Sequence, residues 1–193
     1  EVGERLDEIA HIVLTTHESA LRIIDKVGPL TNPADRDHCL QYIVAVCLLK
    51  GQLTAADYED DAAADPRIDA LRRLMRCVEN PTYSADYMAS DKRSIANAVQ
   101  VFFTDGTATA NVEIEYPIGH RRRRREGIPL LIEKFKRNLA RSFPPEQAEA
   151  TLDLCLDEDE LCMMPVSSFV DRLVVEEYDG DRKRSVQSVV SQY

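Results

Sequence analysis

Five consecutive arginines, Arg121–Arg125, follow His120 in a chain whose formal net charge is −10. A guanidinium group matches a carboxylate with two parallel hydrogen bonds, so such a run suits an anionic ligand. In an extended segment alternate side chains diverge, and only part of the run could face one ligand. We take His120, Arg121 and Arg122 as candidate ligands for an anion; a solvated charged stretch is the alternative interpretation.

The positive charge is concentrated in one place. Between His120 and Arg141, nine Lys or Arg residues against two Glu give a net charge of +7, which leaves −17 on the rest of the chain. A nucleic-acid-binding protein usually spreads its basic residues over one face, because each phosphate contact adds affinity. The rest of this chain would repel a polyanion, so the pattern favours a small anionic ligand or acidic neighbours, and no nucleic-acid partner is expected.

Three residues outside the run could also carry chemistry. His17 follows a predicted strand, where loops often hold binding groups; a surface histidine is the alternative. Arg36 and His38 lie with Asp37 at the predicted start of a helix, where backbone N–H groups favour anions, although simple capping would also explain them. No zinc-protease, Ser-His-Asp or phosphate-loop motif is present, and the cysteines form no CxxC pair, so no metal site is expected.

The elements that would position these residues follow from apolar periodicity and from capping residues. The segment 31–51 predicts the clearest helix, with Thr31 or Asn32 as its cap, Pro33 in its first turn and Gly51 at its end. Further helices are predicted over 54–66, 65–75, 128–143, 144–164 (whole or broken near Asp157) and 165–175.

Strand character is found in three regions. Residues 7–17 are apolar and β-branched, and 76–81 predicts a short strand, followed by a polar loop over 83–93. Residues 94–117 predict a hairpin with a turn at Asp105-Gly106. Its buried face would hold Ile95, Val99, Val101 and Phe103, answered by Val112, Ile114 and Tyr116 on the returning strand. Together the elements predict an α+β fold with a mostly helical C-terminal third.

The chain gives no sign of export or of a membrane span. Its longest apolar stretch, 39–51, is shorter than the roughly 20 residues that a spanning helix needs. No signal-peptide pattern precedes the first element, and three of the five cysteines lie in apolar helical runs. We therefore expect reduced cysteines in a protein that is not secreted.

Several long blocks resemble the C-terminal part of the PrpD branch of the MmgE/PrpD family. They include "GPLTNPADRDHCLQYIVAVCLLKGQLTAADYED", "DKRSIANAVQVFFTDGT" and "VEIEYPIGHRRRRREGIPLLIEKFKRNLARSFP", and the resemblance covers roughly residues 8–173. It implies a small α+β lid domain over 1–118 and, over 119–175, a crossover and C-terminal helices that belong to an all-α domain in full-length members. Residues 176–193 would be a polar, frayed tail.

The resemblance also implies a function. Members of this branch remove water from 2-methylcitrate in propionate breakdown, without a cofactor, in the cytoplasm or the mitochondrial matrix. The implied site binds a tricarboxylate in a cleft beside the lid. Its candidate residues are His17 and His120 as catalytic groups, with Arg36, His38, Tyr42, Arg121 and Arg122 for binding substrate.

The same resemblance places the main acid–base residues in a helical domain that precedes the lid. The portion present here would then have little activity without that domain. A homodimer is expected, with no membrane partner. The alternative is a non-catalytic α+β module. It would self-associate through the apolar stripe 130–139 or dock on an acidic partner through the arginine run.

Overall fold

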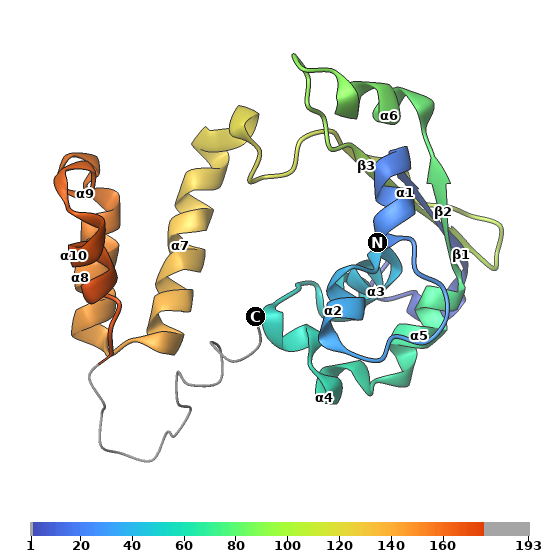
Figure 1. Cartoon of the computed structure of the whole chain (residues 1–193). Coiled ribbons are helices and arrows are strands. Elements are labelled where there is room, and N and C mark those ends of the chain that lie inside the picture. The colour runs from blue at the N-terminus through green and yellow to red at the C-terminus, as the bar shows by residue number, and fades with distance from the viewer. Residues whose placement is uncertain (1, 176–193) are drawn as a thin grey trace. The chain divides into compact units, whose positions relative to one another are not determined.

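The computed structural model describes residues 2–175, and contacts divide the chain into two compact units, Glu1–Arg124 and Arg125–Tyr193 (Figure 1). The first unit combines a four-stranded sheet with helices, and the described part of the second is helical, which confirms the α+β class. The assignment of 1–118 to a lid and of 119–175 to a crossover and returning helices stays a prediction. The tail predicted over 176–193 lies outside the described residues.

The sheet has the strand order β2-β1-β3-β4. Its strands are β1 (Ile9–Thr16), β2 (Met75–Glu79), β3 (Asn97–Phe103) and β4 (Val112–Ile114). β1 pairs in parallel with β2 and antiparallel with β3, so that Leu14 lies between Cys77 and Val99. Ile12 and Leu14 are almost fully buried, whereas His11 is exposed and Val13 is half-buried. This alternation confirms the strand predicted over 7–17.

Short helices surround this sheet. They are η1 (Leu6–Glu8), α1 (Glu18–Ile24), α2 (Pro33–Asp37), α3 (Leu40–Lys50), η2 (Ala55–Tyr58), α4 (Asp60–Ala63), α5 (Pro66–Arg73) and α6 (Pro81–Met88). Helices α2, α5 and α6 begin at Asn or Asp caps: Asn32 accepts from the N–H of Asp35, Asp65 from that of Arg67 and Asn80 from that of Thr82. Local sequence therefore fixes where α2, α5 and α6 start.

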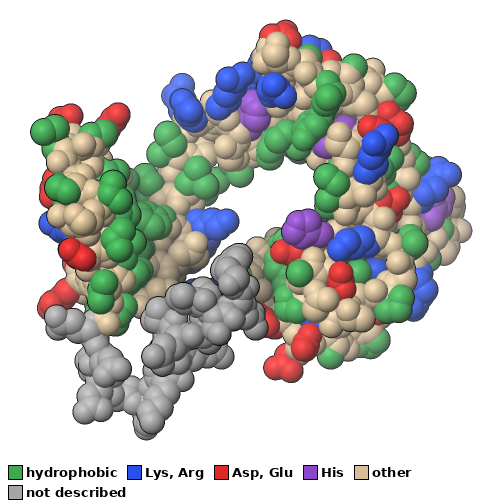
Figure 2. Space-filling view, in the orientation of Figure 1, with side chains coloured by type: hydrophobic (Ala, Val, Ile, Leu, Met, Phe, Trp, Pro, Cys, Tyr) green, Lys and Arg blue, Asp and Glu red, His purple; other side chains and the backbone are tan. Residues whose placement is uncertain are grey.

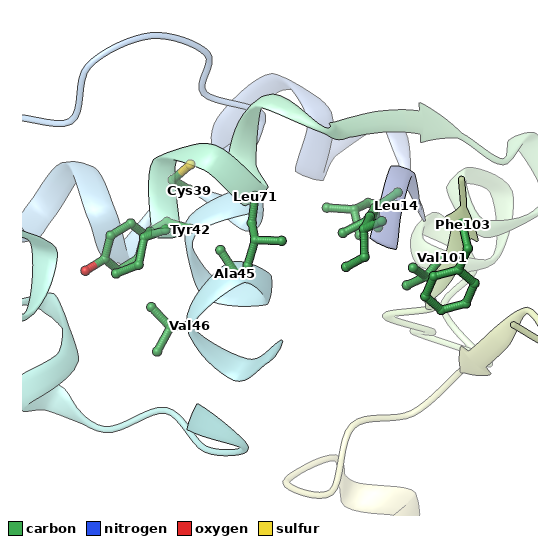
Figure 3. Packing of buried hydrophobic residues seen from close by; sticks show 11 residues of the cluster. Leu14, Cys39, Tyr42, Ala45, Val46, Leu71, Val101 and Phe103 are labelled. Carbon is green, nitrogen blue, oxygen red and sulfur yellow. The ribbon is translucent and has the colours of Figure 1, made fainter. Parts of the chain in front are cut away.

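The core of the first unit lies between the sheet and helices α3 and α5 (Figure 3). Ala45 and Val46 of α3 and Leu71 of α5 are buried together with Leu14 and Val101 of the strands. The apolar surface removed from water is the main stabilising contribution of this contact. This packing fixes α3 and α5 against the sheet.

The helix predicted over 31–51 is in fact two helices. α2 ends at Asp37, and Cys39 has an extended backbone with φ −127° and ψ 107° before α3 begins. Cys39 is completely buried, with its thiol 3.5 Å from the carbonyl oxygen of Lys26. That tertiary contact accompanies the break. The expectation that His38 opens the buried helix is therefore wrong, because His38 lies at the C-terminal end of α2.

The polar loop predicted over 83–93 is also wrong in its first half, which belongs to α6. The helix starts at Asn80, whose side chain caps it, and Pro81 occupies its first turn. Tyr83 is buried, so α6 packs against the rest of the unit instead of extending into solvent as a loop. The prediction read Asn80-Pro81 as the end of a strand and overlooked its value as a helix start.

The hairpin turn is confirmed at Asp105-Gly106. Gly106 has φ +84°, and the N–H of Phe103 donates to the carbonyl of Thr107 at 2.8 Å. The returning strand differs from the prediction, because β4 begins only at Val112 and forms an edge. Val112 is 54% exposed and Ile114 is 49% exposed, so neither joins the core.

The second unit contains α7 from Arg125 onwards (the helix spans Arg124–Ser142), α8 (Pro145–Leu156), α9 (Glu158–Met163) and α10 (Val166–Asp171). The predicted break at Asp157 is confirmed: its side chain caps α9 by accepting from the N–H of Glu160. Leu139 and Leu154 are buried. Many other apolar side chains of this unit remain exposed.

Candidate functional site

His17 lies where β1 ends and α1 begins. It is the N-cap of α1, and its Nδ1 accepts a hydrogen bond from the backbone N–H of Ala20 at 3.2 Å. Its ring stacks on that of Tyr87 from α6, with ring centroids 4.1 Å apart and planes within 9°. Only 6% of His17 is exposed, so the alternative of a surface histidine is wrong.

The environment of His17 favours the neutral ring. Burial lowers the pKa of His17, because a charged imidazolium loses hydration there. Protonation of Nδ1 would also remove the acceptor on which the cap of α1 depends. Burial and the cap therefore both favour the neutral ring of His17.

His120 is the N-cap of a 3₁₀ turn, η3 (Arg121–Arg123), and both of its ring nitrogens have protein partners. Nδ1 accepts from the N–H of Arg122 at 3.2 Å, and Nε2 lies 3.2 Å from the carbonyl oxygen of Arg93. The first bond requires a bare Nδ1, so the ring proton is on Nε2 and is donated to Arg93. In this arrangement His120 holds the chain in place and has no nitrogen left for a ligand.

The arginine run is helical: Arg121–Arg123 form η3, and α7 begins at Arg124. Figure 2 shows Lys and Arg side chains gathered around a histidine over this part of the chain. The Arg122 guanidinium lies over the Tyr116 ring at 4.8 Å and donates to the carbonyl oxygen of Asp91. Arg123 donates to the Tyr116 carbonyl at 3.0 Å. Arg121 is exposed, and its side chain has no hydrogen bond or ion pair to residues 2–175.

The histidines and arginines described above contact α6 or the segment that follows it. We call this group the α6-end cluster: His17, Tyr87, Arg93, Tyr116 and His120–Arg122. Tyr87 lies in α6 and contacts His17, while Arg93, five residues beyond the end of α6, contacts His120. In Figure 1, α6 lies at the end of the sheet opposite α4. The two histidines predicted as catalytic are therefore at the same end of the first unit.

Arg36 and Tyr42 lie elsewhere, on a hollow of about 310 Å³ that we call the arginine hollow. Its polar lining also includes Asp60, Asp69 and Arg72. Arg36 donates to the carbonyl of Tyr58 at 2.7 Å and pairs with Asp60 at 2.8 Å, and its side chain is 7% exposed.

Tyr42, which is 2% exposed, donates its hydroxyl to the carbonyl of Asp57 at 2.6 Å. Burial raises the pKa of Tyr42 and keeps it protonated as a donor. His38 is exposed, away from this lining, and is paired with Asp37. The arginine hollow therefore unites only two of the three substrate-binding residues predicted for this region.

Two residues that the sequence interpretation missed are Tyr87 and Arg72. Tyr87 was assigned to a loop, although the Asn80-Pro81 pair signals the helix that carries it. Arg72 donates to the carbonyl of Gly28 at 2.9 Å and pairs with Asp69, and its side chain is 9% exposed. Arg72 lies on the amphipathic helix α5, where an arginine is expected to face solvent, and nothing in the sequence indicates that it is buried.

The described residues contain neither a metal-binding cluster nor a membrane-spanning helix. No group of three or more His, Cys, Asp or Glu side chains among residues 2–175 is arranged to hold a metal ion. No helix in the same range combines the length and the apolar character needed to cross a membrane. The expectation that no cofactor is needed stays a prediction.

Comparison with known proteins gives consistent matches. The family model described as the MmgE/PrpD C-terminal domain matches residues 1–158. The 2-methylcitrate dehydratase of Cupriavidus necator is 59% identical over 173 residues, which are 90% of this chain and 36% of that protein. That of Salmonella typhimurium is 57% identical over the same shares. The mitochondrial 2-methylcitrate dehydratase of Yarrowia lipolytica is 50% identical over 90% of this chain and 33% of its own. The chain thus spans about a third of the length of these relatives.

Proposed function

This chain belongs to the MmgE/PrpD C-terminal domain family, and we propose that it forms the C-terminal part of a 2-methylcitrate dehydratase. The observation that carries the proposal is identity of 50% or more to three proteins of that name over 90% of the chain. The reaction would remove a proton beside a carboxylate and the hydroxyl group of 2-methylcitrate, giving 2-methyl-cis-aconitate and water in the methylcitrate cycle. It needs a base for the proton and an acid for the departing hydroxyl.

In this proposal the chain supplies carboxylate-binding groups. The Arg121 side chain is exposed and unpaired within the described residues, so it can bind a substrate carboxylate with two hydrogen bonds. Arg122 and His120 hold the turn that presents it. A proton-carrying role for His120 would require one ring nitrogen to leave its present partner. His38 stays a candidate for substrate contact, whereas Arg36 and Tyr42 would have to exchange their hydrogen bonds to the carbonyls of Tyr58 and Asp57 for contacts with the substrate.

The part of the protein that corresponds to the remaining two thirds of the relatives would supply the main acid–base groups. The chain by itself should then have little activity. Its partners would be that helical part and a small tricarboxylate, and a homodimer is the assembly we propose. The compartment would be the bacterial cytoplasm or, as for the Yarrowia lipolytica relative, the mitochondrion.

The test joins residues 1–175 to the N-terminal part of the Cupriavidus necator enzyme, in place of its own matching C-terminal segment. The joined protein should release 2-methyl-cis-aconitate from 2-methylcitrate, measured by absorbance of the new double bond. The unjoined chain is the control and should not. A joined protein that melts cooperatively but leaves 2-methylcitrate intact would reject the proposed function.

A second candidate function is self-association without catalysis. It is favoured by α7, on which Leu130 is 57% exposed and Leu131 is 49% exposed. Both candidates allow a dimer, so light scattering of the chain is combined with melting in the presence of citrate to distinguish them. A dimer that dissociates in Leu130→Glu, with no rise in melting temperature on adding citrate, would favour the second candidate. A monomer stabilised by citrate would reject it.

A further inference from the structure

The ring of His17 is fixed by two independent contacts. The hydrogen bond from Ala20 N–H to Nδ1 holds one edge, and the stack on Tyr87 holds one face. Rotation of the ring about χ2 would break this side-chain cap and leave the N–H of Ala20 with its 3.1 Å hydrogen bond to the carbonyl of His17 alone. A side-chain cap contributes to helix stability, so its loss has a cost. The two contacts therefore select one orientation of the ring.

These contacts also determine which nitrogen carries the proton. A nitrogen that accepts a hydrogen bond from a backbone N–H has no proton of its own, so the neutral ring is protonated on Nε2. Nε2 has no partner among residues 2–175, yet it is not enclosed. The fully enclosed side-chain N and O atoms without a hydrogen-bond partner among residues 2–175 are Thr16 Oγ1, Arg72 Nε and Ser94 Oγ, and His17 Nε2 is not one of them. The Nε2–H group is thus an available donor at the edge of the α6-end cluster.

The charges around His17 do not favour an imidazolium. Glu18 follows it in the chain but pairs with Arg22. Glu79, at the end of β2, accepts from the hydroxyl of Ser84, and that hydroxyl accepts from the N–H of Glu18. From α6 the ring faces the neutral Tyr87. Burial lowers the pKa of His17, in agreement with a neutral ring.

We propose that His17 acts as a neutral hydrogen-bond donor, through Nε2–H, to an oxygen of the carboxylate substrate, and that Tyr87 is the residue that positions it. The inference rests on the proposed function for the identity of the substrate. It replaces the role of proton carrier, because the only nitrogen able to accept a proton is committed to the cap. Donors aimed at an oxygen that gains charge stabilise a transition state without transferring a proton.

The tautomer is tested on the chain itself, without any activity. Long-range ¹H–¹⁵N correlation spectra report which ring nitrogen carries the proton, and the His17 signals are identified by their loss in His17→Asn. We expect a single Nε2–H tautomer at neutral pH, kept in Tyr87→Phe and mixed with the other tautomer in Tyr87→Ala. A proton on Nδ1, or a charged ring at pH 7, overturns the inference whatever the enzyme activity is.

The role as a donor is tested in the joined protein with two matched substitutions. The amide of Asn places its oxygen near the position of Nδ1 and can keep the cap, whereas the amide of Gln places its nitrogen near Nε2 and can keep the donor. We expect His17→Asn to melt normally but to lose about 100-fold in kcat. His17→Gln should melt earlier and keep more activity than His17→Asn.

Equal losses in both variants would contradict the donor role, since neither amide can carry a proton at neutral pH. Tyr87→Ala should lower kcat while Tyr87→Phe does not; equal activity of these two variants would remove Tyr87 as the positioning residue. An unsubstituted joined protein that is inactive rejects the proposed function. The tautomer measurement then still decides the state of His17.

Discussion

The α6-end cluster and the arginine hollow use similar side chains in different ways. In the arginine hollow, the charged and hydroxyl groups of Arg36 and Tyr42 are bonded to the carbonyls of Tyr58 and Asp57. In the α6-end cluster, the exposed Arg121 and the Nε2 of His17 have no partner within residues 2–175. Groups whose hydrogen bonds are already used within the protein stabilise the fold, and groups that are held in place but unpaired are available to a ligand.

The same comparison applies inside the α6-end cluster. His120 and Arg122 are bonded to the carbonyls of Arg93 and Asp91, which join α6 to β3. They fix the turn, and the turn presents Arg121. A cluster that binds a ligand thus contains both kinds of residue, and the distinction between them can be tested by separating effects on stability from effects on binding.

The largest effect that we expect is on stability, from Arg36→Met. The substitution removes the donor to the part-buried carbonyl of Tyr58 and leaves that acceptor unsatisfied, which costs about 1–3 kcal/mol of unfolding free energy. Urea denaturation of the chain measures it. The control is Arg67→Met, because Arg67 is 70% exposed in its pair with Asp65 and should be neutral. A stable Arg36→Met variant would show that the hollow does not depend on this contact and would reopen Arg36 as a binding group.

Arg121→Ala should have the opposite profile in the joined protein. Loss of one charge-assisted carboxylate contact should raise the KM for 2-methylcitrate about tenfold, with no change in melting temperature. Arg125→Ala is the matched control, because it removes the same charge from another exposed position in the run. An equal rise in KM for both variants would indicate a diffuse effect of charge and would contradict a specific role for Arg121.

Tyr42→Phe should cost about 1 kcal/mol of stability, since it removes one donor and leaves the ring in the core. The affinity of the joined protein for citrate should stay the same, because the lost hydroxyl is bonded within the protein. Calorimetric titration with citrate makes the measurement. A weaker affinity at unchanged stability would move Tyr42 from the structural to the ligand-binding group.

The sequence predicted those parts of the fold whose signals are local. The strand over 7–17, the start of α5 at Asp65-Pro66 and the break at Asp157 all follow from apolar patterning or from a capping residue. The split at Cys39 did not, because it involves a contact with the carbonyl of Lys26, thirteen residues away. The exposure of Val112 depends on the edge position of β4, which a hairpin pattern does not reveal.

The candidate site was predictable in its residue types but not in their states. Arginine and histidine beside a turn indicate anion chemistry from their types alone. The sequence cannot tell that Tyr42 donates to a carbonyl fifteen residues away, since every residue has a carbonyl. It also assigned Tyr87 to a loop, and with that the contact that orients His17 was lost.

The smallest effect that we expect is a difference in pH dependence between the two regions. His17 has a lowered pKa in the folded state, so the unfolded chain binds more protons as the pH falls through about 6.5. The stability associated with the neutral ring is therefore complete above that pH and decreases below it. Helix α5 contributes Asp69 and Arg72 to the arginine hollow, and at its start the hydrogen bond from Arg67 lowers the pKa of the capping Asp65 to about 2. Its contribution is complete above about pH 4 and decreases between pH 4 and 2.

Urea denaturation as a function of pH separates these two windows. His17→Asn should remove the dependence that sets in below about pH 6.5 and leave the acid limb unchanged, because Asn keeps the cap without titrating. Asp65→Asn should flatten the acid limb alone, by less than about 1 kcal/mol since the Asp65–Arg67 pair is at the surface. If His17→Asn left the upper window intact, His17 would not be the neutral, buried group on which the contrast between the two regions depends.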